Sequence, residues 1–111
     1  MKKILIANRG EIASRIIKTA QRLGIETVAI YSEADQDLPF VQEATHAYLV
    51  GEGPVQKSYL NQEKILEIAV KEKVDAIHPG YGLLSENAAF CKAVQDHNIS
   101  WIGPSPETIS L

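Results

Sequence analysis

The stretch from His78 to Asn87 (HPGYGLLSEN) combines residue types that suit a recognition loop better than an ordinary connection between two elements. Gly80 and Gly82 permit backbone conformations that are closed to other residues, and they let a partner approach the chain closely. Between them, Tyr81 offers a large ring with a polar tip, which favours contact with a ligand over core filling. His78 comes directly before a proline and either hydrogen-bonds the backbone of this loop or contacts a ligand itself.

A second candidate segment, residues 7–13 (ANRGEIA), follows the first apolar run of the chain. It occupies the place of a phosphate-binding turn, but it has one glycine where the dinucleotide fingerprint needs three. Glu11 would also repel a pyrophosphate at the start of the following helix. The chain contains no P-loop pattern either. Nucleotide binding by this segment is therefore not predicted.

The remaining reactive side chains give no metal site and no catalytic residue. Cys91 is the only cysteine, and its apolar neighbours predict a small buried residue in a helix. No pair of histidines or carboxylates has the spacing of metal ligands. Glu86 and Asn87 are explained by the first turn of a helix, where acidic residues are favoured.

Apolar runs and amphipathic segments alternate along the chain, with short connections between them. The expected strands are residues 3–7, 26–31, 47–50, 75–78 and 100–102. The expected helices are residues 11–23, 39–43, 61–72 and 85–97. Gly24 ends the first of these helices, and Asn61 and Ser85 cap the last two. Because the strands are apolar on both faces, we predict an α/β fold, a doubly wound, mainly parallel five-stranded sheet with helices on both faces.

If the strand order is 3-2-1-4-5, the order reverses between the first and fourth strands. Ligands of open α/β sheets bind beyond the carboxyl ends of the strands at such a point. The loops at that place are residues 8–10 and 78–84, the two most unusual loops of the sequence. This coincidence predicts a functional edge without identifying its ligand.

The first expected helix has an apolar face and a basic ridge. The apolar face comprises Ile12, Ala13, Ile16, Ile17, Ala20 and Leu23. Arg15, Lys18 and Arg22 form the ridge, and Glu11 can pair with Arg15 at a spacing of four residues. Spacing alone favours a solvated face, and a subunit contact through charged side chains is the alternative.

Composition excludes several classes of protein. The 111 residues carry a net charge of −3, which argues against nucleic-acid binding. No apolar run is long enough to span a membrane, and the run after Met1 is too short for a signal peptide, so we expect a cytoplasmic protein. Residues 103–106 (GPSP) lead into a new helical start, so we expect residues 1–111 to be one domain of a longer protein.

Five ordered segments of the chain resemble the N-terminal domain of biotin carboxylase. They are residues 6–13 (IANRGEIA), 31–35 (YSEAD), 58–61 (SYLN), 76–87 (AIHPGYGLLSEN) and 102–104 (IGP). Leu83 stands where many members carry Phe, and the position stays apolar. The resemblance covers the whole chain and implies a Rossmann-like pre-ATP-grasp domain.

The resemblance implies an ATP-dependent ligase. In that family, ATP and bicarbonate form carboxyphosphate, which delivers CO₂ to biotin on a carrier protein. ATP and Mg²⁺ or Mn²⁺ bind in the ATP-grasp and C-terminal domains, so this domain alone should bind no cofactor and be inactive. The implied partners are the biotin carboxyl carrier protein, a carboxyltransferase subunit or domain, as in acetyl-CoA carboxylase, and a second copy in a homodimer.

The resemblance also assigns roles to residues of this sequence. Gly80, Tyr81 and Gly82 would face biotin. The residues that would support this loop are His78, Glu86 and Asn87, and those of the dimer interface are Arg15, Lys18 and Arg22. Two alternatives stay open: another ATP-grasp ligase with the same fold, and a non-catalytic α/β interaction module. The acyl acceptor of the complete enzyme is chosen elsewhere.

Overall fold

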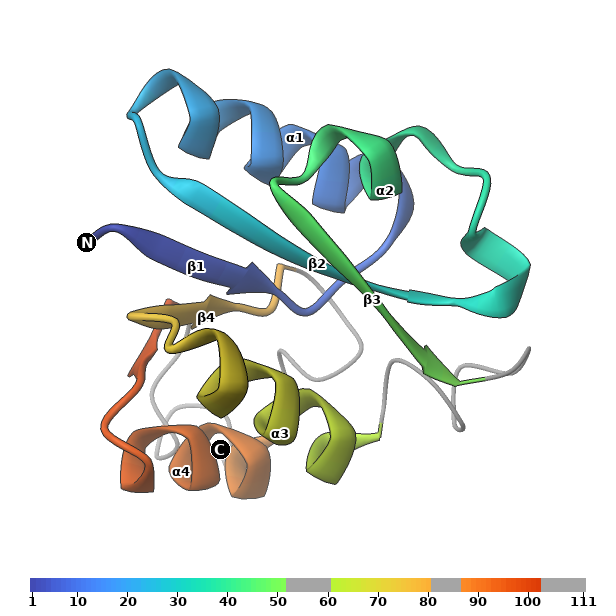
Figure 1. The fold of residues 1–111 in the computed structure, drawn as a ribbon. Coiled ribbons are helices and arrows are strands. Elements are labelled where there is room, and N and C mark those ends of the chain that lie inside the picture. The colour runs from blue at the N-terminus through green and yellow to red at the C-terminus, as the bar shows by residue number, and fades with distance from the viewer. Residues whose placement is uncertain (52–60, 81–86, 103–111) are drawn as a thin grey trace.

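The computed structural model of the chain describes residues 1–51, 61–80 and 87–102. Five parallel strands form one sheet in the order β3-β2-β1-β4-β5 (Figure 1). The strands are β1 (Lys3–Ile6), β2 (Glu26–Ser32), β3 (His46–Gly51), β4 (Ala76–His78) and β5 (Ser100–Trp101). The predicted fold class is confirmed, and the strand order is the one that the sequence analysis considered.

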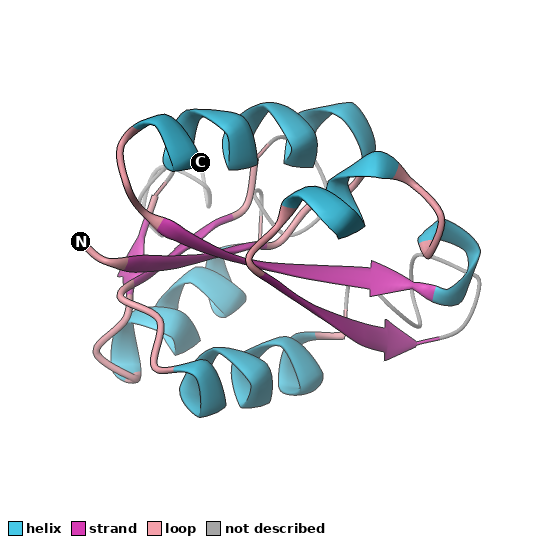
Figure 2. Cartoon of the chain, turned by 45° about the horizontal axis from the view of Figure 1, so that its top comes forward, coloured by secondary structure: helices cyan, strands magenta, loops and turns pink. Residues whose placement is uncertain are grey.

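Helices cover both faces of this sheet. Helices α1 and α2 lie on one face, and α3 and α4 lie on the other (Figures 1 and 2). The helices are α1 (Gly10–Arg22), α2 (Pro39–Glu43), α3 (Gln62–Glu72) and α4 (Ala88–Asp96), and a single 3₁₀ turn, η1 (Glu33–Asp35), follows β2. None of the described helices has the length and apolar character that a membrane crossing requires.

The central strand β1 contributes to a core on each side of the sheet. Leu5 and Ala7 belong to the apolar cluster under α3 and α4, whereas Ile4 and Ile6 belong to the cluster under α1 and α2. Successive side chains of a strand point to opposite faces, so a strand that is covered on both faces must be apolar throughout. This explains why the strand sequences show no polar alternation.

Three helices end in the same way, with one residue in the left-handed conformation. These residues are Gly24 after α1, Lys73 after α3 and Asn98 after α4, with φ of 73°, 54° and 61°. The next residue is apolar each time, and its N–H donates back to the helix in the bonds Ile25→Ala20, Val74→Ala69 and Ile99→Val94. This is the Schellman arrangement, and it directs each helix into the strand that follows. The predicted end of the first helix at Gly24 is confirmed.

Two details of the predicted helices were wrong. Leu23 lies past the end of α1 and its surface is 70% exposed, so it does not belong to the apolar face. The N-cap of α4 is Asn87 rather than Ser85, because the Asn87 Oδ1 accepts the N–H of Phe90 at 2.9 Å. Ser85 lies outside the described residues.

Candidate functional site at the carboxyl edge of the sheet

The chain segments that follow β1 and β4 lie side by side at the carboxyl edge of the sheet. Ile6 pairs with His78 in the parallel register, and the N–H of Ala7 donates to the His78 carbonyl at 2.9 Å. The helix after β1 covers one face and the helix after β4 covers the other (Figure 2). The strand order therefore reverses here, as expected for the ligand-binding edge of an open α/β sheet.

Asn8 joins these two segments through its side chain. It is 2% exposed, and its Nδ2 donates to the carbonyl of Pro79 at 2.7 Å. Its Oδ1 accepts the N–H of Arg9 at 2.8 Å. A side-chain amide is suited to this place because it carries a donor and an acceptor on the same carbon atom.

His78 contacts the same peptide group from the other strand. Its Nδ1 accepts the N–H of Gly80 at 3.1 Å, which requires that Nδ1 be unprotonated. Partial burial lowers the pKa of His78 below its ordinary value of 6.5, because burial disfavours the charged imidazolium. The imidazole is therefore neutral at physiological pH. The local hydrogen bond considered for His78 in the sequence is present.

Gly80 packs against the loop after β1 so closely that no side chain fits. Its φ is 67°, and an added Cβ would lie 2.7 Å from Asn8 Nδ2 and 2.9 Å from Ile12 Cγ2. The close packing of Gly80 against Asn8 and Ile12 explains why position 80 of this loop is a glycine. The predicted biotin-facing residues Tyr81 and Gly82, and the predicted support residue Glu86, lie outside the described residues.

A bidentate ion pair holds the loop after β1 from its other side. Arg9 donates through Nε and Nη2 to the two carboxylate oxygens of Asp35, at 2.6 and 2.7 Å. The Asp35 side chain is 5% exposed and the Arg9 side chain is 46% exposed, so the fork joins a buried carboxylate to a guanidinium that reaches solvent. Sequence reasoning missed this pair. The available signal was that each residue closely follows a strand of the predicted sheet, and that these two strands were expected to be neighbours.

The predicted interface residues of α1 lie on its outer side. Arg15 is exposed and forms no ion pair with a described residue, so the expected pair with Glu11 is absent. Lys18 lies 3.4 Å from the Glu43 carboxylate of α2, and Arg22 donates to the Thr19 hydroxyl at 3.2 Å. Lys18 and Arg22 therefore contact residues of α1 and α2, the two helices on this face of the sheet.

Metal-ligating groups do not converge in the part of the chain that the structure describes. No cluster of three or more His, Cys, Asp or Glu residues is found there. Cys91 is buried in α4, as its neighbours predicted. The described residues at the carboxyl edge thus offer amide, imidazole and backbone groups beside the Arg9–Asp35 ion pair.

Comparison with known proteins agrees with this geometry. The family model for the N-terminal domain of biotin carboxylase matches residues 1–109. Biotin carboxylase 2 of Bacillus subtilis is 62% identical over 108 residues, which are 97% of this chain and 24% of that protein. The chain thus spans about a quarter of the length of this relative.

Two solved structures have the same fold. The urea carboxylase of Kluyveromyces lactis matches with a TM-score of 0.95 and 43% identity, over 98% of this chain and 10% of that one. The biotin carboxylase domain dimer of the 2-oxoglutarate carboxylase of Hydrogenobacter thermophilus, in complex with MgADP, ADP and bicarbonate, matches with a TM-score of 0.93 and 45% identity. That match covers 99% of this chain and 24% of the other.

Proposed function

Because the chain belongs to the family of biotin carboxylase N-terminal domains, we propose that it serves an ATP- and bicarbonate-dependent enzyme that carboxylates biotin on a carrier protein. The observation that carries the proposal is the meeting of the two family motifs at one edge of the sheet. Asn8 of the first motif hydrogen-bonds the Pro79 carbonyl of the second, directly before the Gly80-Tyr81-Gly82 segment.

The role of this domain is to form one wall of the active site. We propose that Gly80, Tyr81 and Gly82 face the biotin ring, and that His78, Glu86 and Asn87 support them. ATP and a divalent metal ion supply the phosphoryl chemistry that makes bicarbonate reactive, and we assign their binding to the ATP-grasp and C-terminal domains of the full-length protein. The MgADP and bicarbonate named for the Hydrogenobacter domain support the use of ATP, a divalent metal ion and bicarbonate by the full-length protein.

The proposed partners are a biotin carboxyl carrier protein, a carboxyltransferase and a second copy of the enzyme. The carboxylases among the relatives support the first two, and the dimer named for the Hydrogenobacter domain supports the third. The exposed ridge of Arg15, Lys18 and Arg22 is the surface that we assign to the dimer. A cytoplasmic location and a role in acetyl-CoA carboxylase and fatty acid biosynthesis are the corresponding proposals for the cell.

The test is ADP release by the full-length protein with ATP, bicarbonate and Mg²⁺, measured with and without free biotin. We expect biotin to accelerate ADP release, and the isolated 111-residue chain to release none. ADP release that does not respond to biotin would instead favour the alternative, another ATP-grasp ligase with this N-terminal fold. Carboxylates and amines that form amides would then be tried as substrates.

A further inference from the structure

One peptide group, between Pro79 and Gly80, is held at both of its polar atoms by side chains. Its carbonyl accepts from Asn8 Nδ2 at 2.7 Å, and its N–H donates to His78 Nδ1 at 3.1 Å. Asn8 follows β1 and His78 ends β4. These two strands are neighbours, and they lie on either side of the point where the strand order reverses. The plane of this peptide is thereby fixed relative to the sheet.

Burial makes this arrangement hard to disturb. Asn8 is 2% exposed and Pro79 is buried, so a broken bond between them would leave a donor and an acceptor with little access to water. Leaving such groups unpaired costs more than the net value of the bond itself. Close packing adds to this constraint, because Gly80 lies against the Asn8 amide with no room for a Cβ.

Asn8 is itself held in place. Its Oδ1 accepts the N–H of Arg9, whose side chain forms the bidentate pair with the buried Asp35 of η1. The N–H of Ala7, one residue earlier, bonds the His78 carbonyl of β4. The amide that holds the Pro79–Gly80 peptide is therefore fixed by contacts on three sides.

We propose that Asn8 is a positioning residue for biotin, which sets the direction in which the chain leaves Gly80 toward Tyr81 by holding the Pro79 carbonyl. This inference rests on the proposed function, in which the residues after Gly80 face biotin. Asn8 acts through the peptide and does not contact the substrate. Its replacement should therefore impair the use of biotin while leaving the use of ATP intact.

The test uses the full-length protein with Asn8→Ala and Asn8→Asp. Asp retains an oxygen for the Arg9 N–H, but a carboxylate cannot donate to the Pro79 carbonyl. We expect KM for biotin to rise about tenfold or more, the effect of one lost hydrogen bond, with KM for ATP unchanged. If the buried charge of Asn8→Asp prevents folding, Asn8→Ala gives the answer alone.

Asn61→Ala is the matched control. Asn61 also uses its side chain to bond a backbone group, because its Oδ1 accepts the N–H of Lys64 at the start of α3. Its replacement should lower stability like the loss of any helix cap, and it should leave KM for biotin at the wild-type value.

Hydrogen exchange at the Gly80 amide supplies a readout that needs no biotin chemistry. We expect faster exchange of this amide in Asn8→Ala and unchanged exchange in Asn61→Ala. Unchanged exchange in Asn8→Ala would show that Asn8 does not hold the peptide. If the wild type uses biotin, and Asn8→Ala shows faster exchange at Gly80 but the wild-type KM for biotin, the positioning role of Asn8 is overturned. A wild type that does not use biotin would overturn the proposed function. Exchange at the Gly80 amide would then test only whether Asn8 holds the Pro79–Gly80 peptide.

Discussion

A buried asparagine must satisfy a donor and an acceptor, and Asn8 does so with two backbone groups of different segments. Neither an aliphatic residue nor an aspartate could make both bonds. The geometry of the site depends on the positions of single atoms. The amide of Asn8, the Nδ1 of His78 and the missing Cβ of Gly80 together determine one peptide plane.

Gly80→Ala should destabilise the chain by about 2–4 kcal/mol, from a disfavoured φ and from displacement of the Asn8 amide. Gly24→Ala is a suitable control, because Gly24 also has a positive φ, of 73°, but nothing lies within 4 Å of an added Cβ. Gly24→Ala should lower the free energy of unfolding only through the disfavoured φ, by about 1–2 kcal/mol. Urea unfolding of both variants, followed by Trp101 fluorescence, measures the difference. Equal losses would show that the approach of Gly80 to Asn8 carries no energy.

Acidification should weaken the chain through His78. Burial lowers the pKa of His78 below 6.5, so the unfolded chain takes up the proton first, and the contribution of His78 to stability is present above pH 6.5. It is lost as the pH falls through the lowered pKa, when a protonated Nδ1 can no longer accept from Gly80.

His78→Asn tests this effect, because its Oδ1 can take the place of Nδ1 and does not titrate. Between about pH 7 and pH 5, wild type should lose stability relative to this variant in urea unfolding, by at most the net value of one hydrogen bond, about 0.5–1.5 kcal/mol. Parallel pH profiles of the two proteins would contradict the assignment of the lost stability to this hydrogen bond.

At the scale of the elements, the three Schellman ends turn helices into strands with a minimum of residues. Each places an apolar residue at the position after the left-handed one, and Val74 and Ile99 are buried there, with 5% and 6% exposure. Gly24 fits the left-handed conformation without strain, and asparagine tolerates it. Lys73 does neither, so this helix end stores a small strain.

Lys73→Gly should therefore stabilise the chain by about 0.5–1 kcal/mol, the relief of the left-handed conformation less the greater freedom of glycine in the unfolded state. Lys71→Gly provides the control, since Lys71 lies in the last turn of α3 with its Nζ 5.4 Å from the centre of the Tyr48 ring. That change should cost about 1 kcal/mol. Urea unfolding compares them, and a loss in both variants would show that the Lys73 conformation is not strained.

At the scale of the whole molecule, the sequence was enough to predict the class of the sheet, whereas its strand order was considered only as a condition. Strands without polar alternation can only be covered on both faces, and helices between them require parallel crossovers. The meeting of the two candidate loops followed from that order. The sequence places Arg9 and Asp35 after two strands that were expected to be neighbours, but whether their side chains pair depends on the approach of two turns in space.

Local ambiguity explains the remaining differences. The apolar spacing of α1 continues to Leu23, but the chain leaves the helix there and exposes this side chain. Ser85 and Asn87 are both residues that cap helices, so composition alone could not choose between them. The structure assigns the cap to Asn87 through its bond to Phe90.

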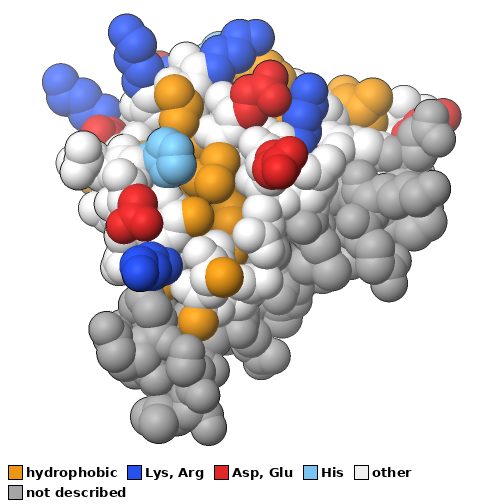
Figure 3. Space-filling model, turned by 90° about the horizontal axis from the view of Figure 1, so that it is seen from below, with side chains coloured by type: hydrophobic (Ala, Val, Ile, Leu, Met, Phe, Trp, Pro, Cys, Tyr) orange, Lys and Arg blue, Asp and Glu red, His pale blue; other side chains and the backbone are white. Residues whose placement is uncertain are grey.

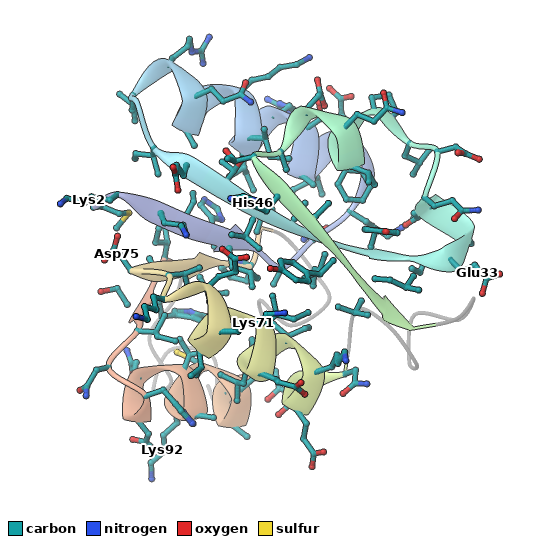
Figure 4. All side chains as sticks on the ribbon, in the orientation of Figure 1. Lys2, Glu33, His46, Lys71, Asp75 and Lys92 are labelled. Carbon is teal, nitrogen blue, oxygen red and sulfur yellow. The ribbon has the colours of Figure 1, made fainter. Side chains whose placement is uncertain are left out.

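The sheet differs between its amino edge, where the parallel strands begin, and its carboxyl edge, where they end. At the amino edge, Asp75 accepts the N–H groups of Lys2 and Lys3, which lowers its pKa, and Lys3 pairs with Glu72 at 3.1 Å. Figure 4 shows Lys2 and Asp75 at this edge and Glu33 at the opposite one. The amino edge is thus closed by its own ion pairs, and the loops of the proposed site occupy the carboxyl edge.

The two helical faces differ as well. On the side of α3 and α4, apolar side chains form a patch between charged side chains of both signs (Figure 3). On the opposite side, the outer surface of α1 carries the basic ridge, with Arg15 exposed. In the proposed symmetric dimer, both copies would use the same patch, so the basic ridge would have to meet acidic groups of the partner and not the partner's own ridge.

In the proposed dimer, Arg15→Glu should weaken association at least about a hundredfold, because Arg15 forms no ion pair with a described residue of its own chain and would have to meet an acidic group of the second copy, which a glutamate would repel. Lys92→Glu is the control, since Lys92 is exposed on α4, on the other face of the sheet (Figure 4). Sedimentation velocity at micromolar concentration should give the monomer mass for Arg15→Glu and the dimer mass for Lys92→Glu. A dimer in both variants would leave the ridge of α1 as a solvated surface, and dissociation of both would show that net charge, not this face, governs association.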